Sequence, residues 1–422
     1  MLKKIPVRHL ELGMYLHSFE GNWVNHPFWS TRFVLQEESI LARARASSLA
    51  ECWIDTSLGT DVPVKPPVAK PTCIEPAADP LLDAPPSAVR TSMSDELNRA
   101  AKLCKTASTQ VMQMFDDARL GRTLDAEGCV SLVHEIYASV SRNPGALLNL
   151  ARLKTQDDYS YMHSVAVCAL MISLARQLGL DDAVSREAGM AGLLHDIGKA
   201  FIPSAILSKP GKLDDHEFTV IKTHPERGHE LLSAGHSVAA SALDVCIHHH
   251  ERMDGKGYPH GLAGDEISLF ARMGAVCDVY DAVTSDRPYK SGWDPADAIA
   301  RMAQWEGHFD PAMIKALIHS LGIYPTGSLV RLESQRVAVV VEQNARAIAK
   351  PVVKVFFSLK SRMPVTPELI DLGGPHCSDK VLSRENVEGW NQRDIAAMWA
   401  GDALPKGFKA PGSAPSRKMK TR

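Results

Sequence analysis

The chain has 422 residues, of which 45% are hydrophobic and 23% are charged, and its formal net charge is −2 at pH 7. This length exceeds that of one ordinary domain and predicts a unit with a large core beside smaller ones. The near-neutral charge provides no field that would attract a polyanion. It therefore argues against a DNA or RNA polymer as the partner and against an electrostatic membrane anchor.

The eight cysteines include no Cys-x-x-Cys pair, and several lie in apolar helical patterns, where a reduced thiol packs as a small hydrophobe. The longest apolar stretch, Val165–Ala175, is interrupted and far shorter than the roughly 20 residues that span a bilayer. Met1–Leu16 has basic residues but no continuous apolar region like that of a signal peptide. We therefore expect a cytoplasmic protein without a membrane span.

The first segment, residues 1–62, mixes short alternating apolar runs with turn signals such as Leu12-Gly13-Met14. This pattern predicts a small α+β N-terminal module. The next segment, 63–91, is rich in proline among Ala, Val and Asp, and such a composition does not form a packed core. We interpret it as a linker.

Helical spacing of apolar residues begins at Ser92 and persists to about Leu321, which predicts a nearly all-helical domain over 92–321. Runs such as Val337–Val341 predict a short β-rich C-terminal appendage over 322–373. The segment 374–422 is rich in Gly, Pro, Lys and Arg at its end and is predicted to be a loose tail. The expected fold is mainly α.

Several polar residues interrupt the apolar faces of the helical segment. His195 and Asp196 are adjacent behind an apolar helical run, and Gly198 allows close backbone approach, so both side chains could reach one metal ion. An isolated His-Asp pair is more often a surface dyad or a helix cap. His163 lies on the polar side of an otherwise apolar helix, where a packed core histidine is an equal alternative to a ligand.

The density of such residues rises further along the chain. His224-Pro225 opens another helix, and the run His248-His249-His250-Glu251 precedes a glycine-rich loop. Asp278 stands inside an apolar helix, where an aspartate is rarely buried without a cation or a hydrogen-bond partner. Together these residues favour a metal site over unrelated surface groups.

The pair His195-Asp196, followed by the continuous run from His249 to Pro259, resembles the HD-GYP signature of bacterial cyclic di-GMP phosphodiesterases, a branch of the HD superfamily of metal-dependent phosphohydrolases. Gly261, Gly264 and the basic segment 287–290 continue the match, which covers about 155–320. The segment Met1–Asp55 resembles an uncharacterised module often found ahead of such domains. The resemblance implies a helical HD-type catalytic domain in second-messenger signalling.

The family pattern also implies a ligand set. One metal would be held by His163, His195, Asp196 and Asp278, and Asp196 would bridge to a second metal held by His224, His249 and His250. Imidazole and carboxylate ligands without thiolate suit iron or manganese better than soft-ligand metals. Family members with a third metal carry an acidic residue where this chain has Tyr159, so we expect two divalent ions. His248 and Glu251 are expected to orient neighbours or face solvent.

Two cations bridged by a carboxylate can share a water, lower its pKa and aim the hydroxide at a phosphodiester phosphorus. Asp196 is thus a predicted catalytic residue. Lys199, one helical turn later, is predicted to be catalytic and to contact a phosphate oxygen. Arg287 and Lys290 are predicted phosphate contacts, and Asp281 a further substrate contact with a guanine edge or with lysine side chains.

The loop at Gly257, Tyr258 and Pro259 is implied to shape the site and to contact GGDEF-type partner domains. Cyclic di-GMP as substrate enters only through the resemblance, with the linear dinucleotide pGpG as product and GMP as the alternative end product. Two other hypotheses stay open. The chain could be an HD phosphohydrolase of another nucleotide, or a non-catalytic cyclic di-GMP receptor or scaffold; retention of all the expected ligands argues against the receptor.

Overall fold

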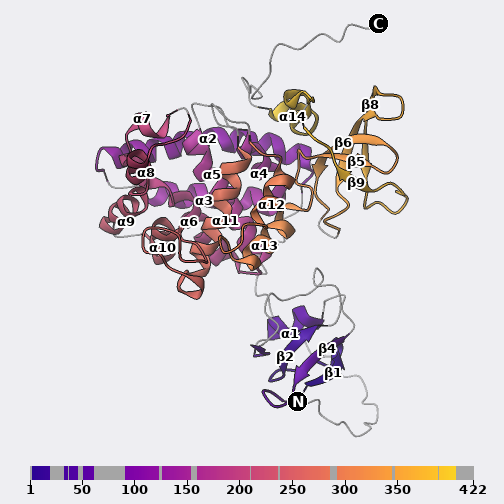
Figure 1. Cartoon of the computed structure of the whole chain (residues 1–422), viewed down its shortest axis with the longest axis horizontal. Helices are drawn as coiled ribbons and strands as arrows, with labels where there is room; N and C mark the ends of the chain where they lie inside the picture. Colours follow the sequence, from indigo (N-terminus) through magenta and orange to yellow (C-terminus); the bar gives the residue numbers. More distant parts are fainter. Residues whose placement is uncertain are drawn as a thin grey trace, which may run out of the picture. The chain divides into compact units, whose positions relative to one another are not determined.

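The computed structural model describes residues 2–19, 33–36, 38–45, 51–60, 91–122, 126–153, 159–209, 211–235, 238–285, 292–344, 347–387 and 389–404. The chain divides into two compact units, residues 1–84 and 85–422 (Figure 1). Apart from Thr91, the linker expected at 63–91 lies outside the described residues. No helix in the described part of the chain is long and apolar enough to cross a membrane.

The first unit contains a four-stranded antiparallel sheet with the order β1-β4-β2-β3. Its elements are β1 (Leu2–Pro6), β2 (Tyr15–Phe19), β3 (Phe33–Val34), α1 (Glu38–Arg45) and β4 (Glu51–Asp55). Side chains alternate along β4, so that Cys52 and Ile54 enter a core shared with Ile5 and Leu16. The small α+β module predicted at the N-terminus is thereby confirmed.

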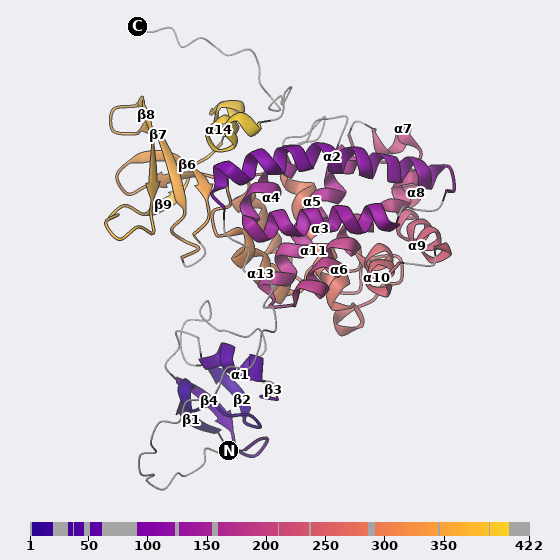
Figure 2. The same cartoon turned by 180° about the vertical axis from the view of Figure 1, so that it is seen from behind.

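The second unit is mainly helical, as predicted (Figure 2). Its helices before the C-terminal sheet are α2 (Met93–Arg119), α3 (Ala126–Arg142), α4 (Pro144–Arg152), α5 (Tyr159–Gln177), α6 (Asp182–Leu194), α7 (Ser204–Leu207), α8 (Asp215–Ile221), α9 (His224–Ala234), α10 (Ala240–His248), α11 (Leu269–Thr284), α12 (Pro295–Met302) and α13 (Pro311–Leu321). Short 3-10 helices lie at Ile197–Phe201 (η3) and Gly264–Glu266 (η4).

Helix α5 lies at the centre of this unit. The apolar run Val165–Ala175, apart from a buried serine in it, is hydrophobic throughout, and its side chains are buried against α2, α4, α6, α11 and α13. A helix that is apolar on all sides gains stability only when neighbours surround it, since each buried aliphatic side chain contributes about 1.5–3 kcal/mol. The two ends of α5 therefore stand at fixed positions in the helical body.

A five-stranded antiparallel sheet follows, with the order β8-β7-β6-β5-β9. Its strands are β5 (Leu329–Leu332), β6 (Arg336–Glu342), β7 (Val352–Ser358), β8 (Met363–Asp371) and β9 (Val381–Arg384). One face carries a core that includes Val330, Val340 and Val353. The β-rich appendage predicted from the valine runs is present.

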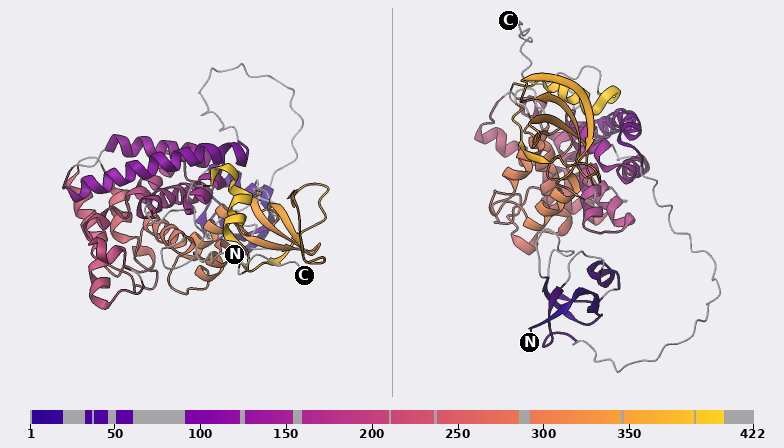
Figure 3. Two further views of the ribbon diagram at one scale, coloured as in Figure 1. Left: turned by 90° about the horizontal axis from the view of Figure 1, so that it is seen from above. Right: turned by 90° about the vertical axis from the view of Figure 1, so that its right-hand side faces the viewer.

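The prediction of a loose tail from residue 374 is wrong for part of that segment. Strand β9 pairs with β5, and α14 (Gln392–Ala400) packs against β6 (Figure 3). Asn391 caps α14 by accepting from two backbone N–H groups, and Trp399 is buried. The composition of the final residues hid this short apolar helix face. Residues 405–422 lie outside the described part.

Candidate metal centre

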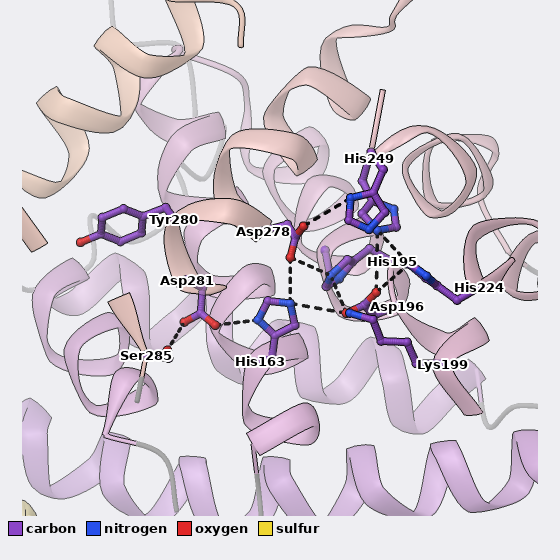
Figure 4. Close-up of polar contacts among 12 residues, drawn as sticks. His163, His195, Asp196, Lys199, His224, His249, Asp278, Tyr280, Asp281 and Ser285 are labelled. Carbon is purple, nitrogen blue, oxygen red and sulfur yellow. Dashed lines mark hydrogen bonds and ion pairs between the residues drawn. The ribbon is translucent and has the colours of Figure 1, made fainter. Parts of the chain in front are cut away.

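The expected metal ligands come together in two adjoining groups (Figure 4). The first group, named here the carboxylate group, consists of His163, His195, Asp196 and Asp278. The second, the imidazole group, consists of His224, His249 and His250. Within each group the ligand atoms lie within 4.8 Å of one another. All these side chains are buried except that of His250, which is half-buried.

Close backbone packing brings the two groups together. Helix α6 ends at Leu194, so His195 and Asp196 stand in the turn that leads into η3. A Cβ atom on Gly198 would lie 1.9 Å from the backbone oxygen of His224. Only glycine allows the start of α9 to approach η3 this closely, and the approach places His224 beside Asp196.

Asp196 lies between the two groups, with one carboxylate oxygen toward each. Its Oδ2 is 3.4 Å from His163 Nε2 and 3.3 Å from His195 Nε2. Its Oδ1 is 3.2 Å from His224 Nε2 and 3.7 Å from His249 Nε2. This is the arrangement that a carboxylate shared by two cations requires.

Asp278 makes a second, longer connection between the groups. Its Oδ1 is 2.9 Å from His163 Nε2, and its Oδ2 is 3.8 Å from His250 Nδ1. The carboxylate comes from the middle of α11, and its side chain is 8% exposed. Asp278 therefore belongs mainly to the carboxylate group.

Backbone carbonyl groups fix the orientation of three imidazoles. The Nδ1 atoms of His195, His224 and His249 lie 2.7, 2.7 and 2.9 Å from carbonyl oxygens about one turn earlier in the chain. Since a carbonyl only accepts, each Nδ1 carries the proton and donates it. Each Nε2 then directs its lone pair into the cluster, as a metal ligand must.

His163 is oriented instead by a carboxylate. Its Nδ1 is 2.6 Å from Oδ2 of Asp281, whose Oδ1 accepts from Ser285 Oγ at 3.3 Å. Figure 4 shows Asp281 on the side of His163 away from the other ligands. The Asp281 side chain is 0% exposed. The expectation that Asp281 contacts substrate is therefore wrong, because its carboxylate is enclosed behind a ligand histidine.

The pKa values of the histidines are shifted in opposite directions in the two groups. Burial alone would lower the pKa of His163, but hydrogen bonds to Asp196, Asp278 and Asp281 outweigh it and raise the pKa to about 10. In the imidazole group, burial lowers the pKa of His249 to about 3, assisted by His195 and His224. Burial also holds the pKa of His250 well below its usual range.

The carboxylates of the cluster stay ionised. Burial would raise the pKa of Asp196, but Lys199 and His195 outweigh this and lower it well below its usual range. The same holds for Asp278, where His163 is the main opposing partner. Lys199 forms an ion pair with Asp196 Oδ2 while its side chain remains 24% exposed. It thus lies at the edge of the cluster, between the carboxylate and solvent.

The residues fit a bound cation. Among the described residues, Nε2 of His195 and Oδ1 of Asp196 are buried atoms without a hydrogen-bond partner. Each such atom costs about 1–3 kcal/mol unless something satisfies it. A divalent cation in the carboxylate group would satisfy His195 Nε2, and one in the imidazole group would satisfy Asp196 Oδ1, since the donor set is imidazole nitrogen and carboxylate oxygen. The cluster is therefore a His/Asp group able to bind metal ions.

Glu251 ties the end of the ligand helix to the following loop. Its buried Oε1 accepts from the backbone N–H groups of His260 at 2.7 Å and Gly261 at 3.1 Å. A buried carboxylate that accepts two N–H groups makes strong, charge-assisted bonds. Glu251 therefore orients the loop, as the sequence analysis expected, and is outside both ligand groups.

The loop at Gly257, Tyr258 and Pro259 lies against the imidazole group. A Cβ atom on Gly257 would be 2.4 Å from Cα of Glu251, so a side chain is excluded there. The N–H of Tyr258 donates to the backbone oxygen of His250 at 3.2 Å. The rings of His250 and Tyr258 are in contact, tilted by 30° with their centroids 4.7 Å apart. Tyr258 thus holds His250 and is only partly open to solvent.

The remaining expected residues lie outside the cluster or outside the described part. His248 bonds to Asp244 at 2.7 Å and to His260 at 3.0 Å, away from both ligand groups. Arg287 and Lys290 lie outside the described residues, as does the side chain of Tyr159. Their predicted roles stay predictions.

Comparison with known families identifies two regions of the chain. The HD domain family matches residues 140–313, which include all the ligands of both groups. A domain of unknown function, DUF3391, matches residues 2–129, which include the N-terminal sheet.

Known relatives extend the likeness to nearly the whole chain. Cyclic di-GMP phosphodiesterase PA4108 of Pseudomonas aeruginosa is 52% identical over 96% of this chain and 98% of its own length. The cyclic di-GMP phosphodiesterase response regulator RpfG of Xanthomonas campestris is 47% identical over 34% of this chain and 39% of its own. A 3'3'-cGAMP-specific phosphodiesterase 2 of Vibrio cholerae is 35% identical over 41% of this chain and 33% of its own. The chain belongs to the HD-GYP family of cyclic di-GMP phosphodiesterases.

Proposed function

We propose that this protein is a metal-dependent phosphodiesterase that hydrolyses cyclic di-GMP to pGpG, with GMP as the alternative end product. The observation that carries this proposal is the position of Asp196, with its two carboxylate oxygens directed at two separate groups of buried ligands. The 52% identity to a cyclic di-GMP phosphodiesterase over nearly the full length supports the choice of substrate.

Two divalent ions are proposed, one in the carboxylate group and one in the imidazole group, with Asp196 shared between them. Bound there, the ions would supply Lewis acidity toward phosphate oxygens and lower the pKa of water. The ligand set favours iron or manganese. No third ion is proposed, because Tyr159 stands where a further carboxylate would be needed.

Side chains around the two ligand groups are proposed to orient a ligand and to bind the substrate. Asp281 holds His163 by its Nδ1 atom, so that Nε2 faces the cluster. The ammonium of Lys199, at the edge of the cluster, is placed to contact a non-bridging phosphate oxygen and to stabilise the charge that develops there. Arg287 and Lys290 are proposed to hold the substrate phosphates. The roles of Asp281 and Lys199 rest on their positions, and those of Arg287 and Lys290 rest on the family pattern alone.

Contacts beyond the substrate are also proposed. A GGDEF-type partner domain would meet the loop at Gly257, Tyr258 and Pro259. Because the Tyr258 ring packs on His250, binding of such a partner would act on a candidate metal ligand through this ring contact. The cytoplasm is the proposed location. The division into an N-terminal module, linker, catalytic domain and β-rich appendage is kept as the proposed domain organisation.

A second cyclic dinucleotide is a competing substrate. The observation in its favour is the 35% identity, within the catalytic region, to a 3'3'-cGAMP-specific phosphodiesterase. The metal chemistry would be unchanged, because both substrates carry the same kind of phosphodiester bond. A non-catalytic receptor is the weaker alternative, since such a protein would not need both ligand groups.

The experiment is hydrolysis of cyclic di-GMP and of 3'3'-cGAMP by protein purified anaerobically and analysed for metal, with products resolved by chromatography. The test variant is Asp196→Ala, and the control is Asp265→Ala, whose side chain is fully exposed. Metal-dependent pGpG formation by the wild type and the control, absent in Asp196→Ala, is the expected result. Faster turnover of 3'3'-cGAMP would identify that dinucleotide as the preferred substrate. No turnover of either dinucleotide with two bound metals would contradict the proposal that the protein is an enzyme of this class.

A further inference from the structure

A lysine next to the metal centre is held by two aromatic rings. Lys222 caps the C-terminal end of α8, where its backbone N–H donates to the backbone oxygen of Phe218 at 3.0 Å. Its Nζ atom lies 4.9 Å from the centroid of the Phe218 ring and 6.0 Å from that of the Tyr258 ring. Both distances are within the range of cation–π attraction. The ammonium group therefore has a preferred place between α8 and the loop that follows His250.

This ammonium group has no anionic partner in the described part of the chain. A lysine ammonium carries three hydrogen-bond donors. Among the described residues, no acceptor lies within hydrogen-bond distance of Lys222 Nζ and no carboxylate lies within ion-pair distance of it. Lys199 differs in this respect, because it is ion-paired with Asp196. The donors of Lys222 are thus available to an anionic ligand.

The ring of Tyr258 connects Lys222 with the metal centre. This ring contacts that of His250, with the two centroids 4.7 Å apart, and its own centroid is the one 6.0 Å from the Lys222 ammonium. Along the chain, Lys222 precedes His224 by two residues. Two members of the imidazole group are therefore close neighbours of this lysine, through a ring contact and through the backbone. Lys222 adjoins the imidazole group, whereas Lys199 adjoins the shared carboxylate.

The proposed substrate carries two phosphodiester groups and hence two negative charges. One phosphate would be cleaved at the metal centre. The other must lie a short distance away, because both phosphates belong to one small ring. An ammonium group beside the imidazole group is placed to meet this second phosphate. Bonds from an ammonium group to phosphate are charge-assisted and stronger than bonds between neutral groups.

We propose that Lys222 binds the phosphate of the cyclic dinucleotide that is not cleaved, and that the rings of Phe218 and Tyr258 hold the lysine in place for it. This inference rests on the proposed function, because it takes a cyclic dinucleotide as the substrate. Lys222 then favours substrates with two phosphates over those with one. The second phosphate takes no part in bond breaking, so its contact is the same before and during the reaction. Loss of the contact should therefore raise KM and leave kcat unchanged.

The test compares two phosphodiesters with full-length, metal-loaded protein: cyclic di-GMP, which has two phosphates, and bis(p-nitrophenyl) phosphate, which has one. Lys222→Met keeps a long apolar side chain for the two rings but removes the charge, and Lys222→Arg keeps the charge. The matched control is Lys350→Met, since Lys350 is an exposed lysine between β6 and β7. Calorimetric titration with a slowly hydrolysed phosphorothioate analogue of cyclic di-GMP measures binding without turnover.

For Lys222→Met, the KM for cyclic di-GMP and the Kd of the analogue are expected to rise about tenfold or more. Its kcat, its metal content and its kinetics with bis(p-nitrophenyl) phosphate should stay unchanged. Lys222→Arg should recover most of the affinity, and Lys350→Met should match the wild type. Phe218→Leu, which removes one ring, should raise the same KM by about threefold.

Two results would overturn the inference. One is a KM and a Kd of Lys222→Met within about twofold of the wild-type values. The other is an equal loss with bis(p-nitrophenyl) phosphate, which would indicate a disturbed metal centre instead of a lost phosphate contact. Absence of cyclic di-GMP turnover by the wild type would contradict the proposed function, and the Kd of the analogue would still decide the role of Lys222.

Discussion

The carboxylate group and the imidazole group lie side by side but are built on different electrostatics. The carboxylate group holds Asp196 and Asp278, which are ionised, and its His163 has a pKa raised to about 10. The imidazole group contains only histidines, and burial lowers the pKa of His249 to about 3. One group therefore offers negative charge to a cation, while the other offers mainly neutral lone pairs.

This difference shows that the imidazole group depends on a carboxylate that it shares with the carboxylate group. A divalent cation is held by charge as well as by geometry, and the imidazole group obtains its nearest negative charge from Oδ1 of Asp196. Asp278 approaches that group only at 3.8 Å. We expect the ion in the imidazole group to be the more weakly held, and we expect Asp196 to matter to both.

The largest effect is expected from Asp196→Asn. The amide keeps the size but removes the shared charge, so both groups lose affinity for metal and turnover falls by about 10³-fold or more. Elemental analysis should show loss of metal from both groups. Turnover within tenfold of the wild type would contradict the view that this carboxylate is shared.

The next largest effect is expected from His224→Gln, which removes an imidazole whose Nε2 lies 3.2 Å from the shared carboxylate of Asp196. One metal should remain, in the carboxylate group, while turnover falls by about 10²-fold. The reciprocal change, His163→Gln, should weaken the metal of the carboxylate group instead. Equal loss of both metals in both variants, measured by elemental analysis after gel filtration, would remove the distinction between the groups.

A smaller effect is expected from Asp281→Asn, because this residue acts through His163. Loss of the anionic acceptor weakens the orientation of His163 and should lower metal affinity at the carboxylate group by about 10- to 100-fold. Excess metal should restore turnover, which a folding defect would not allow. Ser285→Ala, which removes a hydroxyl group that donates to Asp281, is the matched control and should change affinity little.

The smallest effect is expected from Glu251→Gln. The amide oxygen can still accept from the N–H groups of His260 and Gly261, so only the charge assistance is lost. We expect about a threefold rise in KM with metal content unchanged. Steady-state kinetics check the KM, and chelator titration of the variant checks its metal affinity. A loss of metal as large as that in Asp281→Asn would show that the loop supports the imidazole group more strongly than the contacts indicate.

The residues of the two candidate ligand groups were predictable because their signals are local or belong to a long motif. His195 and Asp196 are adjacent, His249 and His250 open the run that ends at Pro259, and Asp278 interrupts an apolar helix. Asp281 was assigned wrongly for a related reason. Its spacing from Asp278 defines a helix face, but that spacing does not reveal that His163, 118 residues earlier in the chain, lies against it.

The sequence by itself determined the mainly α fold, the sheets at both ends and the candidate ligand residues, because helical and strand periodicity and motif spacing are properties of short segments. The tertiary structure alone decided which oxygen of Asp196 faces which group, that α14 forms within the expected tail, and how closely η3 and the start of α9 approach each other. These features arise where segments distant in sequence pack together. The close approach of Gly198 to His224 is the clearest example, since neither residue predicts it alone.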